Sequence, residues 1–167
     1  MTSPTNGVET MTAKELINYA QLMESAADYM AEKKGEPFQT PESVAAFMYP
    51  LTRDLEQEHI WVITIDSKGY LKSLCDVTVG TVNSCLAHPR EIFKQAVLDS
   101  AASVIVIHNH PSGDPTPSKQ DVALTKQLIE AGKILEIRLH DHVIVGKKAD
   151  ISSWWYSTRR ELILDFE

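Results

Sequence analysis

The chain is predicted to fold as an α/β or α+β protein, with helices packed around a mixed β-sheet. The first observation is that segments with a helical repeat of apolar residues alternate with segments rich in β-branched and aromatic residues. The second is composition, because 167 residues with 43% apolar and 23% charged side chains suit one globular domain with a real core. We therefore expect one main domain over residues 40–167, preceded by a helical extension over residues 1–39.

The extension is predicted to contain an amphipathic helix from Thr12 to Lys34. Thr12 and Glu15 have the spacing of a capping box, and apolar residues then recur at helical intervals until Gly35 and Pro37. The apolar stripe either packs on the domain core or forms a surface for another subunit. A homo-oligomer formed through this helix is therefore one of the two possibilities that the sequence allows.

The main domain is predicted to begin with a short helix that has Thr40 as N-cap, Pro41 at its first position and Pro50 at its end. A hairpin follows, in which the turn sequence DSKG joins EHIWVITID to YLKSLCDVTVG. Next come a helix in HPREIFKQAVLDSA, a buried strand in SVIVIH, a helix in SKQDVALTKQLIEAG ended by Gly132, and a strand in ILEIRLHDHVIVG. The tail ISSWWYSTRRELILDFE leaves room for one more short helix.

Composition and charge disfavour several functional classes. The 16 basic and 23 acidic residues give a net charge of −7, and no more than two basic residues are adjacent. Nucleic acid is an unfavoured partner, because binding to phosphates needs clustered cations. No membrane span or secretory signal is visible, so a cytoplasmic protein is expected. Cys75 and Cys85 lack the spacing of a zinc knuckle and are too few for a disulfide framework.

The stretch HNHPSGDPTPSKQD, residues 108–121, concentrates side chains that can bind a metal. His108 and His110 stand at the exit of a strand and project to the same face of it. Prolines and glycine then turn the chain into a helix whose first turn holds Asp121, so this carboxylate can face the histidines as a third ligand. Two histidines and one aspartate leave the fourth tetrahedral position of zinc for water, as catalytic sites do.

The same stretch has other interpretations. Ser118 and Asp121 also form an S-x-x-D capping box, which would explain both residues without a metal. The consecutive letters HNH do not form a nuclease motif, because Asn109 points to the opposite face of the strand and the nuclease residues are dispersed. The zinc deaminase signature, H-x-E with P-C-x-x-C, is missing. His59, His88 and His140 match no motif and are interpreted as structural or surface residues outside the candidate site.

The spacing of His108, His110, Ser118 and Asp121 resembles the JAMM (JAB/MPN) metalloprotease motif at every fixed position. Over residues 40–155, the segments HNHPSGDPTPSKQD, VGTVNSCLAHPREIFKQAV and LHDHVIVG resemble the RadC family of bacterial JAB-domain proteins. The resemblance implies a JAB/MPN-like mixed sheet flanked by helices, a sandwich similar to that of cytidine deaminases.

The family pattern also contains a glutamate eight residues before the aspartate that closes an early strand, and Glu58 ahead of Asp66 fits this place. Without the resemblance, Glu58 is one of three acids in an exposed approach to a strand. The resemblance implies one zinc ion per chain, held by the two histidines and Asp121, that activates water against a peptide or isopeptide bond. Glu58 would be the general base, and Ser118 would donate a hydrogen bond to the oxyanion.

Three functional classes follow from the resemblance. The leading one is a zinc-dependent metallopeptidase or isopeptidase of the JAMM type. The second is a DNA-repair accessory protein, a label that the family carries, although residues 1–39 are too short for the helix-hairpin-helix module often found there. The third is a catalytically silent MPN scaffold, against which the intact ligand set argues. Asp141 and His142 match a family motif and are candidates to orient the ligand histidines, and a buried hydrogen-bonded pair is an equal alternative.

Overall fold

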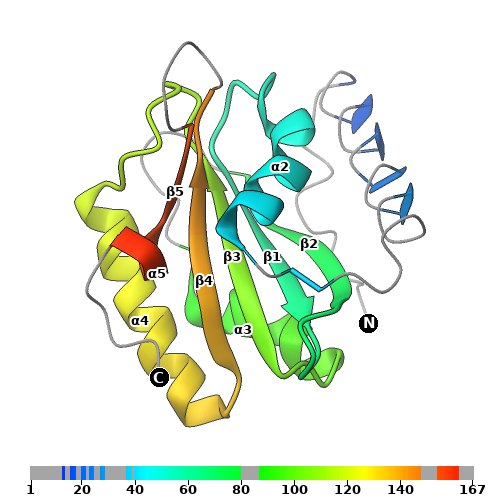
Figure 1. Cartoon of the computed structure of the whole chain (residues 1–167), viewed down its shortest axis with the longest axis vertical. Coiled ribbons are helices and arrows are strands. Elements are labelled where there is room, and N and C mark those ends of the chain that lie inside the picture. The colour runs from blue at the N-terminus through cyan, green and yellow to red at the C-terminus, as the bar shows by residue number, and fades with distance from the viewer. Residues whose placement is uncertain are drawn as a thin grey trace, which may run out of the picture. The chain divides into compact units, whose positions relative to one another are not determined.

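The structure is a computed structural model of the chain. It describes residues 40–79, 87–147 and 154–161, together with residues 37 and 38 and nine positions between 13 and 28. The chain divides into two compact units, Met1–Gly35 and Glu36–Glu167. The second unit contains the β-sheet (Figure 1).

In the first unit, all the described positions are helical and exposed to solvent. They lie within the predicted span from 12 to 34: Ala13, Leu16, Ile17, Ala20, Gln21, Met23, Glu24, Ala27 and Asp28. The other positions of the predicted helix lie outside the described residues. Its part in forming a homo-oligomer stays a prediction.

Five strands of the second unit form one mixed sheet in the order β2-β1-β3-β4-β5. β1 runs antiparallel to both β2 and β3, β3 and β4 are parallel, and β4 and β5 are antiparallel. The strands are β1 (His59–Ile65), β2 (Leu71–Val79), β3 (Ser103–Asn109), β4 (Arg138–Val145) and β5 (Trp155–Ser157). The predicted mixed sheet with flanking helices is therefore confirmed.

Helices cover both faces of the sheet. α2 (Pro41–Thr52) lies in front of the sheet and α3 (Pro89–Leu98) lies behind it in Figure 1. α4 (Lys119–Leu135) joins the parallel strands β3 and β4 by the crossover that parallel neighbours require. The main core lies between the sheet and these last two helices, and its members include Ile60, Val62, Ile92, Phe93, Val104, Val106, Leu128 and Leu139.

Two predicted helix ends were wrong. α2 runs through Pro50 to Thr52, although the ring of Pro50 has no N–H to donate to the helix. α4 runs past Gly132 to Leu135, and Glu136 takes the left-handed conformation at φ 55°. Gly132 is needed for space, because a Cβ there would lie 2.6 Å from the backbone oxygen of Ile137.

The C-terminal tail contains the strand β5 as well as the short helix α5 (Thr158–Glu161), and the strand was not predicted. Cys75 is half-buried and carries a free thiol, whereas Cys85 lies outside the described residues. None of the helices in the described ranges is both long and apolar enough to cross a lipid bilayer.

Candidate metal centre

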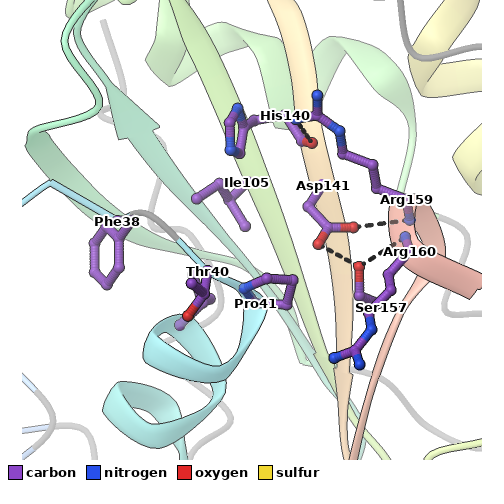
Figure 2. A pocket seen from close by; sticks show the side chains of 10 residues that line it. Phe38, Thr40, Pro41, Ile105, His140, Asp141, Ser157, Arg159 and Arg160 are labelled. Atoms are coloured by element: carbon purple, nitrogen blue, oxygen red, sulfur yellow. Dashed lines mark hydrogen bonds between the residues drawn. The ribbon is translucent and has the colours of Figure 1, made fainter.

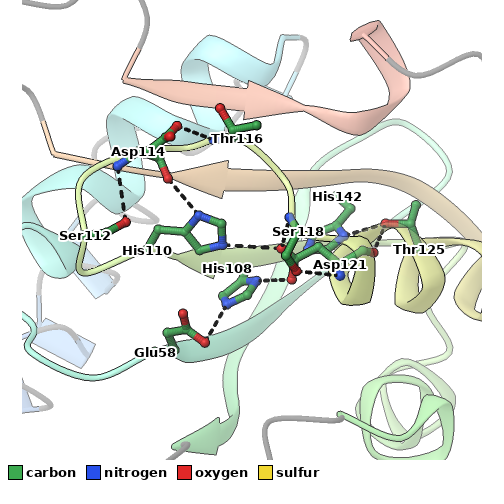
Figure 3. A network of polar contacts seen from close by, with 10 residues as sticks. All are labelled: Glu58, His108, His110, Ser112, Asp114, Thr116, Ser118, Asp121, Thr125 and His142. Atoms are coloured by element: carbon green, nitrogen blue, oxygen red, sulfur yellow. Dashed lines mark hydrogen bonds and ion pairs between the residues drawn. The ribbon is translucent and has the colours of Figure 1, made fainter. Parts of the chain in front are cut away.

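The candidate metal-binding residues gather where β3 ends and α4 begins. His108 is a buried residue near the end of β3, and His110 directly follows that strand. Asp121 is a buried residue in the first turn of α4. Glu58 directly precedes β1, the strand that pairs with β3 and places Ile60 opposite His108. Glu58 is thereby brought beside three residues that lie about 50 positions or more further along the sequence (Figure 3).

The distances between these side chains are short. The Asp121 carboxylate lies between the two histidines, with Oδ1 3.0 Å from Nδ1 of His108 and Oδ2 3.4 Å from Nε2 of His110. Oε2 of Glu58 lies 3.7 Å from Nε2 of His108. One ligand atom from each of Glu58, His108 and His110 lies within 4.8 Å of the others, so this cluster could hold a metal ion.

The contacts of His110 call for a proton or a metal ion at its Nε2. Its Nδ1 lies 2.8 Å from the backbone oxygen of Asp114, and a carbonyl oxygen only accepts, so Nδ1 carries the hydrogen. In the neutral ring, Nε2 is then a bare lone pair that faces an oxygen of Asp121. Two acceptors face each other unless a proton or a metal ion lies between them. Burial lowers the pKa of His110, but the contacts with Asp121 and Asp114 outweigh burial and raise it above the usual value.

His108 shows the same need for a cation. Within the described part of the chain, neither of its two buried ring nitrogens has a hydrogen bond, although each lies near a carboxylate. Oδ1 of Asp121 lies 3.0 Å from Nδ1 of His108, but the two groups are not aligned for a hydrogen bond. Leaving a buried polar atom unpaired costs about 1–3 kcal/mol. A nitrogen that binds a metal ion has no such deficit, so the donor set fits a divalent cation.

The capping box of Ser118 and Asp121 is present together with the histidine contacts. The Asp121 N–H donates to Oγ of Ser118 at 3.2 Å, and Oδ2 of Asp121 accepts from the Ser118 N–H at 2.7 Å. Burial opposes the charge on Asp121, but the close contacts with His108 and His110 and the hydrogen bond from Ser118 hold its pKa well below the usual range. The two interpretations of these residues are therefore compatible, because the cap fixes the carboxylate that faces the histidines.

Glu58 and Asp121 differ in their access to solvent. The Glu58 side chain is 46% exposed, whereas that of Asp121 is 7% exposed. A buried carboxylate with fixed hydrogen bonds suits a metal ligand, and an exposed carboxylate beside the site can exchange protons with water and substrate. Ser118 is also exposed, and its hydroxyl hydrogen has no acceptor among the described residues.

A β-bulge separates Asp141 from the candidate site. Leu139 pairs with Val104 and Asp141 pairs with Ile105, so His140 is an extra residue that reverses the faces of the residues after it. Asp141 therefore points away from the histidines and accepts hydrogen bonds from the Ser157 hydroxyl and from backbone N–H groups (Figure 2). It lines a separate cavity of about 460 Å³ beside α2. The sequence-based role of Asp141 in orienting a ligand histidine is not supported.

His142 lies on the face of the candidate site but acts through α4. The Thr125 hydroxyl donates to the Asp121 backbone oxygen at 2.7 Å, so it must accept the hydrogen of Nδ1 of His142, 2.8 Å away. The rings of His142 and His108 are stacked, with centroids 6.2 Å apart. Burial, together with charge on the neighbouring histidines, lowers the pKa of His142 to about 3. His142 therefore supports the helix turn that holds Asp121 and contacts a ligand ring only by stacking.

Sequence reasoning missed Thr125 and a pair of glycines. The loop after His110 approaches the end of β4 so closely that a Cβ on Gly146 would lie 2.2 Å from the oxygen of Gly113. The backbone N–H of Lys147 donates to the same oxygen at 3.1 Å, and the N–H of His110 donates to Val145. The only signal in the sequence is the glycine that ends the apolar run HVIVG.

The chain is similar to known proteins over most of its described length. A family model described as "RadC-like JAB domain" matches residues 38–161. A UPF0758 protein of Desulforamulus reducens is 48% identical over 106 residues, 64% of this chain and 47% of that protein. A UPF0758 protein of Methanosarcina mazei is 37% identical over 141 residues, 84% of this chain and 61% of that protein. The chain thus spans about half to three-fifths of the length of the curated relatives it matches.

Proposed function

The chain belongs to the RadC-like JAB domain family, and we propose that it is a zinc-dependent hydrolase that cleaves an amide bond in a peptide or isopeptide. The observation that carries this proposal is the convergence of a buried histidine, a half-buried histidine and a buried aspartate beside an exposed glutamate. Metal sites of hydrolases combine such ligands with a nearby general base.

The residues that would hold the ion are His108, His110 and Asp121. Two imidazole nitrogens and one carboxylate form a donor set typical of catalytic zinc, although such donors also accept iron or manganese. When bound, zinc supplies a Lewis acid that polarises a carbonyl group and makes a water acidic near neutral pH.

The acid–base step would fall to Glu58. Its carboxylate accepts a proton from the attacking water, whose oxygen joins the carbonyl carbon of the substrate. When the C–N bond breaks, Glu58 returns this proton to the leaving nitrogen, so the products are an amine and a carboxylic acid, which then loses its proton to water. A general base in such a position contributes about 10²- to 10⁴-fold to the rate.

Ser118 would stabilise the oxyanion that develops on the carbonyl oxygen. Its exposed hydroxyl accepts from the Asp121 N–H, and this bond leaves the hydroxyl hydrogen able to donate to the substrate. A donor in this role contributes about 3 kcal/mol to transition-state stabilisation.

The test is hydrolysis by the zinc-loaded chain, compared with Glu58→Gln and the matched control Glu56→Gln. Glu56 is an exposed acid of the same segment, two residues away. Peptide and isopeptide-linked libraries are incubated in ¹⁸O-labelled water, and the products are weighed by mass spectrometry. We expect one ¹⁸O in each new carboxylate, a loss of at least about 100-fold in Glu58→Gln and no loss in Glu56→Gln.

Two outcomes would contradict the proposal. Equal turnover in the wild type and Glu58→Gln would remove Glu58 from the role of general base. Retained zinc without cleavage of any library member would favour a catalytically silent scaffold.

A further inference from the structure

Asn109 occupies the position between the two histidines and is 2% exposed. Its amide makes two hydrogen bonds to the segment before β1. The backbone N–H of His59 donates to Oδ1 of Asn109 at 2.7 Å, and Nδ2 of Asn109 donates to the backbone oxygen of Gln57 at 3.0 Å. These partners fix the orientation of the amide, because a backbone N–H only donates and a carbonyl only accepts. The two bonds enclose Glu58, which lies between Gln57 and His59.

The Asn109 amide takes over where the backbone ladder stops. Pairing between β1 and β3 runs from Ile65 opposite Ser103 to Ile60 opposite His108. Beyond His108, the side chain of Asn109 supplies one acceptor and one donor to the neighbouring segment, as a paired strand would. The segment that leads into β1 is thereby held against β3 beyond the last backbone pair of the two strands.

The segment is also held from its other side. The ring of His59 is stacked on that of Trp61, with centroids 5.1 Å apart and planes at 7°. Nδ1 of His59 lies 3.2 Å from Oδ2 of Asp76 on β2. The backbone on both sides of Glu58 is thus fixed, and its side chain points to the same face as Ile60 and His108 because side chains alternate along a strand.

We propose that Asn109 is a positioning residue that fixes Glu58 beside the metal site through the backbone of Gln57 and His59. The effect of Asn109 on turnover rests on the proposed function. Its effect on the position of Glu58 does not. Asn109 does not belong to the ligand set, since its amide is committed to the two backbone groups. Its loss should therefore affect Glu58 and leave metal affinity unchanged.

Two variants of Asn109 separate the two bonds. Asn109→Asp keeps the acceptor for the His59 N–H but loses the donor to Gln57, and Asn109→Leu has a similar size and loses both. The control is Asp99→Asn at the other end of β1, where Asp99 accepts from the hydroxyls of Thr64 and Ser73. This control weakens the same strand without touching the segment of Glu58.

The experiment measures three quantities on the full chain. The first is zinc affinity, by competition with a chromophoric chelator. The second is the pseudocontact shift of the Glu58 side-chain carboxyl carbon in the cobalt(II)-loaded protein, which depends on its place relative to the ion and needs no turnover. The third is kcat and KM on a substrate found as described above.

The expected result for both Asn109 variants is zinc affinity within about twofold of the wild type and a Glu58 pseudocontact shift that collapses toward an averaged value. The kcat value should fall about 10- to 100-fold with little change in KM, since a displacement of about 1 Å costs this much. Asp99→Asn should lower only the melting temperature. If Asn109→Leu does not fold, Asn109→Asp gives the same test.

Three results would overturn the inference: an unchanged Glu58 shift in both Asn109 variants, the same change in Asp99→Asn, or a loss of zinc affinity as large as the loss of turnover. If the wild type hydrolyses nothing, the proposed function fails, and the Glu58 shift still decides whether Asn109 positions this residue.

Discussion

The contact between Gly146 and the loop after His110 predicts a selective loss of metal affinity on substitution. In Gly146→Ala, the new Cβ would lie 2.2 Å from the oxygen of Gly113, 2.9 Å from its carbonyl carbon and 3.1 Å from Cδ of Pro115. An ordinary contact begins near 3.4 Å, so the loop must move by about 1.2 Å. This loop includes Asp114, whose backbone oxygen fixes the ring of His110. Overpacking of this kind costs about 1–3 kcal/mol of stability.

We expect zinc affinity to fall about 10- to 100-fold in Gly146→Ala, the range seen when a group that orients a metal ligand is lost. The matched control is Gly132→Ala, whose Cβ would lie 2.6 Å from a backbone oxygen at the far end of α4. Chelator competition measures the affinity, and thermal unfolding of the metal-free proteins measures the stability. Both variants should lower the melting temperature, but only Gly146→Ala should weaken zinc binding. Equal affinities in the two variants would refute the reasoning.

Three further predictions concern the neighbours of the site. Asp121→Asn should lose zinc while Glu58→Gln keeps it, as measured by elemental analysis, and the reverse pattern would exchange the roles of ligand and base. His142 has its pKa lowered to about 3, so between pH 6.5 and 3 the unfolded chain binds a proton that the folded chain does not. The metal-free protein should therefore lose about 1.4 kcal/mol of stability per pH unit below 6.5 from this group. Urea unfolding at several pH values gives the free energy of unfolding as a function of pH, and its slope should be smaller in His142→Gln by the share of one proton. Thr125→Val should cost about 1–3 kcal/mol in the same assay, because it leaves the buried Nδ1–H of His142 without an acceptor, and a cost below 0.5 kcal/mol would contradict that hydrogen bond.

The sequence predicts most of the sheet because each strand has a distinct composition. EHIWVITID and SVIVIH contain runs of β-branched residues; β1 lies within the first, and β3 covers the second and one further residue, Asn109. Helix ends are harder to predict, since they depend on contacts with other elements. Gly132 predicts the end of a helix, but in the structure it is a helical residue that lies close to the backbone of Ile137.

The candidate ligands are also predictable, because strand alternation and the first turn of a helix fix the faces of His108, His110 and Asp121. The positions of Asp141 and His142 are not. Regular alternation would place Asp141 on the face of Leu139, but the bulge at His140 exchanges the two faces, and no local pattern marks that bulge. The bonds of Asn109 to the segment of Glu58 likewise span 50 residues of sequence and depend on the pairing of β1 with β3.

The measurement that tests the central claim most directly is the metal content of the purified full chain, compared with His110→Ala and His140→Ala. His140 is the matched control because it lies at the bulge of β4, beside the cavity that Asp141 lines. We predict about one zinc per chain in the wild type and in His140→Ala, and none in His110→Ala. The absence of metal from the wild type after zinc supplementation, or equal metal in all three proteins, would contradict the account.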